Sequence, residues 1–137
     1  MSAHPYLRAY MAGIVLPTMF LLIVFTFFCV ARFGYNIDFQ IERVIVFPLA
    51  LVPNLWGIWN MLYVWLRSHH RLPLGFHGAV LPVLLTPLSL ILAKALGFAI
   101  PGYFAAAIYV AFPVVLVVYY LTWKYFVGFF NELLGVA

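Results

Sequence analysis

The sequence predicts an all-α integral membrane protein with four transmembrane helices, and three observations lead to this prediction. Hydrophobic residues make up 68% of the 137 positions and charged residues only 7%, whereas a soluble domain has about 25% charged residues. Four apolar runs are each long enough to cross a hydrocarbon core of about 30 Å. No segment is polar enough to fold separately in water, so residues 1–137 are expected to form a single transmembrane domain.

The first two spans are expected at residues 11–31 and 44–66. The first run has 21 residues, which is too long for the apolar part of a signal peptide, so a retained helix is predicted. The second run has 23 residues without a charge and holds two prolines, two asparagines and three tryptophans. Asp38 is a candidate N-cap, which would start the second helix near Phe39.

The other two spans are expected at residues 76–98 and 103–123. A basic turn precedes the third span, and Lys94 near the end of that span can reach the interface with its charged group. Pro101 and Gly102 form the next turn. Trp123 and Lys124 belong to an interfacial group, after which residues 126–137 are expected to be a helical end at the membrane surface.

The topology follows from the number of spans. Four spans place both termini on one side, together with Arg8, Arg67, Arg71, Lys124 and all four histidines. The excess of cations on that side predicts cytoplasmic termini, in a membrane of the bacterial inner type. Cys29 is the single cysteine, so no internal disulfide is possible.

An internal repeat appears when the sequence is shifted by 65 residues. Residues 13–17 (GIVLP) then fall on residues 78–82 (GAVLP), and the Phe-Pro pair at 47–48 falls on that at 112–113. This pattern predicts two tandem two-helix hairpins, residues 1–67 and 68–137, related as parallel repeats by an axis along the membrane normal.

Proline recurs at the matching place in each half, so proline-kinked helices are expected. A helical proline leaves the carbonyl four residues back without its usual donor. Pro17 and Pro82 free the carbonyls of Gly13 and Gly78, and Pro113 frees that of Tyr109. Two interpretations remain open: the kinks shape the bundle, or the freed carbonyls line a wet path or a cation site.

Small and polar residues indicate where helices meet. Small side chains on one helical face let backbones approach closely in lipid, and the helix-packing candidates are Gly57, Ala79, Ala93 and Gly97. Buried amides and hydroxyls need internal partners. They serve either as interhelical contacts or as the lining of a channel or binding site, for which the candidates are Asn54, Asn60, Thr86, Ser89, Tyr109, Gly13 and Gly78.

The basic turn between the second and third spans predicts contact with lipid headgroups, through Arg67, His69, His70 and Arg71. The spacing of the histidines, with no carboxylate or cysteine on that turn, is not typical of a metal or haem site. No metal, cofactor or nucleic-acid partner is therefore expected.

Three classes of function remain after this reading, and no catalytic constellation is present in the apolar runs. The first is a non-catalytic membrane component that works through helix packing, as a homo-oligomer or as a subunit of a larger assembly. The alternative is a small oligomeric channel or facilitator for an ion or small solute. A lipid-handling or redox enzyme comes third. Ionisable groups inside the membrane usually carry such chemistry, and the four apolar runs contain no acidic residue. The expected partners are the lipid bilayer and either the protein itself or another membrane protein.

Overall fold

The computed structural model describes residues 3–38, 41–69 and 72–136, in which every regular element is a helix. The elements in order are α1 (Pro5–Cys29), the π-helical segment η1 (Val30–Gly34), α2 (Ile41–Val44), the π-helical segment η2 (Ile45–Ala50), α3 (Leu51–Leu66), α4 (Leu74–Ala95), α5 (Phe104–Thr122), the π-helical segment η3 (Trp123–Val127) and α6 (Gly128–Leu133).

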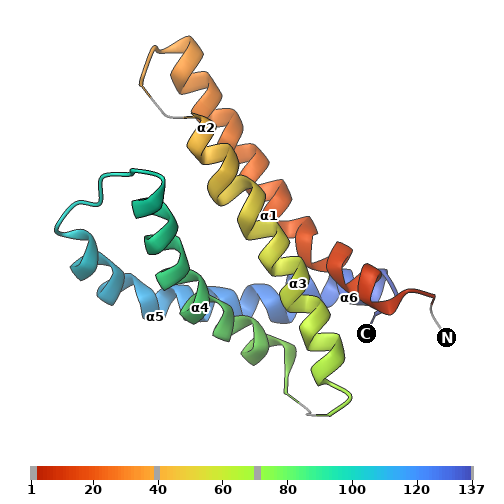
Figure 1. Cartoon of the computed structure of the whole chain (residues 1–137). Helices are drawn as coiled ribbons and strands as arrows, with labels where there is room; N and C mark the ends of the chain where they lie inside the picture. The colour runs from red at the N-terminus through yellow and green to blue at the C-terminus, as the bar shows by residue number, and fades with distance from the viewer. Residues whose placement is uncertain (1–2, 39–40, 70–71, 137) are drawn as a thin grey trace.

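The first hairpin consists of α1 packed lengthwise against α3 (Figure 1). The two helices approach closely because glycines lie at the contact. A Cβ added to Gly13 would lie 2.7 Å from the carbonyl oxygen of Trp56, and one added to Gly57 would lie 2.5 Å from the ring of Tyr10. This is the close packing that small residues permit between helices in lipid.

The second hairpin consists of α4 and α5, and it diverges from the first (Figure 1). Beyond α5 the chain continues through η3 into α6 and reaches α1. The N and C termini lie close together (Figure 1), and Arg8 Nη1 donates a hydrogen bond to the carbonyl oxygen of Leu134 at 3.4 Å.

Three helical stretches in the described residues are long and apolar enough to cross a membrane: Pro5–Gly34, Leu74–Ala95 and Phe104–Leu133. The protein is therefore all-helical in its described part and suited to a membrane. The second predicted span is helical from Ile41 to Leu66, as α2, η2 and α3 in succession. Of these, α3 has 16 residues, which is about 24 Å.

The helix ends differ from the predicted ones. α1 begins at Pro5, six residues before the first apolar run, because proline is suited to the first turn of a helix. The predicted start near Phe39 lies outside the described residues. α4 ends at Ala95 and not near Phe98, because Gly97 adopts a φ of +76° and the N–H groups of Gly97 and Phe98 cap the last turn.

The C-terminal segment differs most from its prediction as a surface helix. It is helical as far as Leu133, but Trp123, Val127 and Asn131 are buried. The side chain of Trp123, which was expected in an interfacial group, is fully buried within the protein. α5 itself contributes no buried residue.

Candidate functional site

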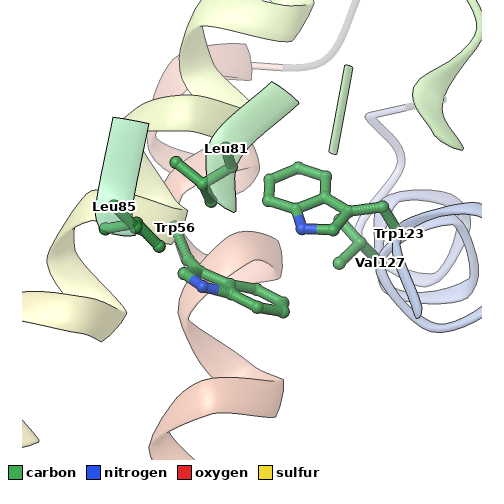
Figure 2. Close-up of a cluster of buried hydrophobic side chains, with 5 residues drawn as sticks. All are labelled: Trp56, Leu81, Leu85, Trp123 and Val127. Atoms are coloured by element: carbon green, nitrogen blue, oxygen red, sulfur yellow. The ribbon is translucent and has the colours of Figure 1, made fainter. Parts of the chain in front are cut away.

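The core lies at the junction of the two hairpins and consists mainly of aromatic and aliphatic side chains. Figure 2 shows Trp56 of α3 and Trp123 of η3 lying close to each other beside Leu81, Leu85 and Val127. The two indole rings are 5.3 Å apart between centroids and inclined at 35°. Large aromatic surfaces dominate the energetics of such a contact, so this cluster holds α4 and η3 against α3.

Trp59 and His77 join the same helices through two reciprocal hydrogen bonds. The indole Nε1 of Trp59 donates to the carbonyl oxygen of His77 at 2.8 Å, and the imidazole Nε2 of His77 donates to the carbonyl oxygen of Trp59 at 2.8 Å. We assign the proton to Nε2 because a carbonyl only accepts. The rings stack with centroids 4.8 Å apart. His77, in the first turn of α4, is therefore a buried connection between α3 and α4.

Asn60 and Asn131 form a fully buried amide pair. Asn60 Nδ2 donates to Asn131 Oδ1 at 2.7 Å, and Asn131 Nδ2 donates back to Asn60 Oδ1 at 3.2 Å. Asn60 Nδ2 also donates to the carbonyl oxygen of Ala9 at 2.7 Å. Three helices, α1, α3 and α6, thus meet at one amide whose side chain has no exposed surface.

The core also contains two buried indole N–H groups, Trp56 Nε1 and Trp123 Nε1, for which the described residues supply no acceptor in full hydrogen-bond geometry. The ring of Tyr119 lies 5.3 Å from that of Trp56. Beside this pair lies an apolar cavity of about 430 Å³ between α1, α3 and α5, lined by Leu16, Phe20, Val52, Trp56 and Tyr119 among others.

Gly13 and Asn60 lie against each other, since a Cβ added to Gly13 would lie 3.0 Å from Asn60 Cβ, but the other residues predicted to line a channel or binding site are spread over separate surfaces. Asn60 is buried in the amide pair, whereas Asn54 is exposed and bonds to Tyr10 and to the carbonyl of Ala50. Tyr109 is 82% exposed on α5. Thr86 and Ser89 are half-buried on α4. Gly13 and Gly78 lie in close helix contacts: a Cβ added to Gly78 would lie 2.0 Å from Trp123 Cγ.

The residues predicted for helix packing lie in different settings. Gly57 packs against Tyr10 and Ile14 of α1. Ala79 and Ala93 are half-buried. Gly97 lies beyond the end of α4, where it accepts a hydrogen bond from Arg43 through its carbonyl oxygen at 3.2 Å.

The predicted headgroup residues lie at the turn between α3 and α4. Arg67 and His69 are exposed, and His69 packs against the ring of Trp65 with centroids 5.3 Å apart. Arg67 borders a surface cavity with Pro5, Tyr63 and Ser68. His70 and Arg71 lie outside the described residues.

Sequence reasoning missed the roles of His77, Trp123 and Asn131. An asparagine in an apolar helical run needs a hydrogen-bond partner in lipid, and that signal was available for Asn131 in the run FVGFFNELL. In the described part of the chain, no three His, Cys, Asp or Glu side chains come together as a group that could hold a metal ion. Comparison of the chain with family models, with curated proteins and with solved structures finds no match.

Proposed function

We propose that the protein is a non-catalytic integral membrane component that works through helix packing, as a homo-oligomer or as a subunit of a larger membrane assembly. The observation that carries this proposal is that the buried polar side chains connect helices to one another. Hydrogen bonds between helices are made by Asn60, Asn131 and His77. Interhelical hydrogen bonds and close glycine contacts are the means by which helices associate in lipid.

The proposed architecture has four spans. Residues 44–66 form the remaining crossing in this proposal, since they are helical throughout and lie between Arg43 and Arg67. The hydrogen bond from Arg8 to the Leu134 carbonyl oxygen joins the beginning of α1 to the residue after α6, and this contact supports an even number of crossings. In the sequence, four cations fall on the side of the termini (Arg8, Arg67, Arg71 and Lys124) and three on the other side (Arg32, Arg43 and Lys94), which favours cytoplasmic termini in a bacterial-type inner membrane.

The proposed duplication is supported by one matched contact. Gly13 in α1 packs on Trp56 and Gly57 of the following helix, and Gly78 in α4 packs on Trp123. A shift of 65 residues carries Gly13 onto Gly78 and carries position 58, next to Gly57, onto Trp123. Gly13 and Gly78 therefore each contact the next long helical stretch of their own half, at positions that nearly correspond under the 65-residue shift.

The test is the mass of the purified protein in nanodiscs, followed by a flux assay in liposomes on the same sample. Helix packing as the function predicts either a defined homo-oligomer or stable co-purification with another membrane protein, and no flux. Flux of a small ion that Asn60→Ala abolishes, with the assembly intact, would contradict the proposal and favour a channel. The matched control is Val114→Ala, which shortens an exposed apolar side chain on α5.

A further inference from the structure

The outward surfaces of the long helices have no protein partner in the described structure, and they differ in chemistry. On α5, Val110 and Val114 form an apolar patch and are 79% and 63% exposed, next to Tyr109, which is 82% exposed. On α3, the exposed surface includes the amide of Asn54. An apolar surface is matched by lipid chains, whereas an amide facing hydrocarbon is costly.

Asn54 lies close to the middle of the membrane. It stands eleven positions after Arg43 and thirteen positions before Arg67, which is about 17 and 20 Å from the two flanking charges at 1.5 Å per residue. The ester groups and headgroups of lipids lie in the interfacial regions, outside the hydrocarbon core. Neither water nor a lipid carbonyl is therefore at hand for this amide.

The amide of Asn54 is only partly satisfied within the chain. Its Oδ1 accepts from the Tyr10 hydroxyl, and its Nδ2 donates to the carbonyl oxygen of Ala50 at 2.7 Å. A carboxamide has two N–H donors and two acceptor lone pairs. One N–H and one lone pair of Asn54 consequently have no partner in the described part of the chain.

A donor and an acceptor on one side chain are self-complementary. The protein already shows this pairing between Asn60 and Asn131, whose amides exchange hydrogen bonds at 2.7 and 3.2 Å. In two copies inserted in the same orientation, Asn54 lies at the same depth. A two-fold axis along the membrane normal brings these two amides face to face.

The rest of this surface fits a helix–helix contact. Asn54, Ile58, Met61 and Trp65 follow at spacings of 4, 3 and 4 residues and so share one face of α3. Ile58 and Trp65 are 54% and 51% exposed. The seven-residue period matches left-handed helix pairs, in which one polar asparagine among apolar positions fixes the register.

We propose that the protein forms a parallel two-fold dimer through this face of α3, with Asn54 pairing with its copy at mid-membrane. The inference rests on the proposed function, since it names the partner and the surface by which the helices assemble. It commits to a second copy of the chain because the pairing is self-complementary and the two copies share one depth.

The experiment compares dimer dissociation constants in nanodiscs or mild detergent, by sedimentation over a range of protein-to-detergent ratios. Asn54→Ala is expected to weaken the dimer about tenfold, which corresponds to about 1.4 kcal/mol. Asn54→Gln, which keeps an amide, should recover part of the loss. Val114→Ala on the apolar surface of α5 is the matched control at similar depth and should leave the constant unchanged.

A second variant separates the contact between copies from the bond inside the hairpin. Tyr10→Phe removes the internal donor to Asn54 and frees another acceptor, so the dimer should persist or tighten. If Tyr10→Phe weakens the dimer as much as Asn54→Ala does, Asn54 acts only by holding α1 and the inference is wrong. Cross-linking gives an independent readout in a Cys29→Ser background: Ile58→Cys should form a disulfide-linked dimer, and Val114→Cys should not.

The outcomes also separate this inference from the proposed function. A homo-oligomer that Asn54→Ala leaves intact overturns the α3 interface but keeps helix packing as the function. A wild-type monomer that co-purifies with another membrane protein overturns the second copy as partner and keeps the subunit function. A wild-type monomer that conducts an ion overturns both.

Discussion

Replacing Asn131 by leucine is the most direct perturbation of the junction between the first hairpin and the C-terminal helix. The change removes both hydrogen bonds to Asn60, and interhelical hydrogen bonds in membrane proteins contribute about 0.6 kcal/mol each on average. It also leaves the Asn60 carbonyl oxygen without a donor at a side chain with no exposed surface, which costs about 1–3 kcal/mol. We expect Asn131→Leu to lower the free energy of unfolding by about 2–4 kcal/mol.

The reciprocal nature of the pair makes a double-mutant cycle the decisive assay. Asn60→Leu alone leaves the buried amide of Asn131 unpaired, whereas the double variant leaves neither amide, so its loss should fall short of the sum by about 1–2 kcal/mol. Unfolding in mixed micelles, followed by tryptophan fluorescence, measures each loss. Asn54→Leu combined with Asn131→Leu is the control and should be additive, because Asn54 bonds elsewhere. Additivity of the Asn60 and Asn131 changes to within about 0.5 kcal/mol would refute the reasoning.

Three further substitutions test the packing of the second hairpin. Gly78→Ala places a Cβ 2.0 Å from Trp123 Cγ and should destabilise the fold by about 2–3 kcal/mol, which lowers the melting temperature. The control is Gly102→Ala, which should change the melting temperature little because a Cβ there meets nothing within 4 Å. Gly97→Ala puts a side chain at a φ of +76° and should lower the free energy of unfolding by about 1 kcal/mol, measured as a lower denaturant midpoint. An unchanged midpoint would contradict the capping role of Gly97. His77→Phe keeps the ring but loses its hydrogen bond to α3, so a loss of about 1 kcal/mol is expected; stability equal to wild type would show that stacking alone suffices.

The existence of the helices could be predicted from the sequence because run length and hydropathy decide whether a segment suits a bilayer. The ends of the helices could not, because they depend on local backbone chemistry and not on where apolar residues stop. Pro5 starts α1 ahead of the apolar run, and Gly97 ends α4 before the run is over. Pro5 and Gly97 are both visible in the sequence, but the predicted helix boundaries followed the ends of the apolar runs.

Only one property of the candidate site could be predicted, namely that its buried amides need hydrogen-bond partners. Asn60 was expected to need a hydrogen bond inside the protein, and the structure supplies one. Its partner Asn131 is 71 residues away in the sequence, in a segment whose aromatic and basic residues are typical of the membrane surface. Trp123 was assigned to the surface for the same reason, yet the continuation of α5 through η3 to α1 buries it.

The two asparagines of α3 show why we propose a contact between two copies of the protein. Six residues separate them, which rotates the second side chain about 120° from the first on a helix, so one inward face cannot satisfy both. Asn60 points into the junction and makes three hydrogen bonds there, while Asn54 is exposed and makes two hydrogen bonds in the described part of the chain. A second helix is the partner that we propose for the unused part of the Asn54 amide, and the face that Asn54 shares with Ile58 is where that helix should lie.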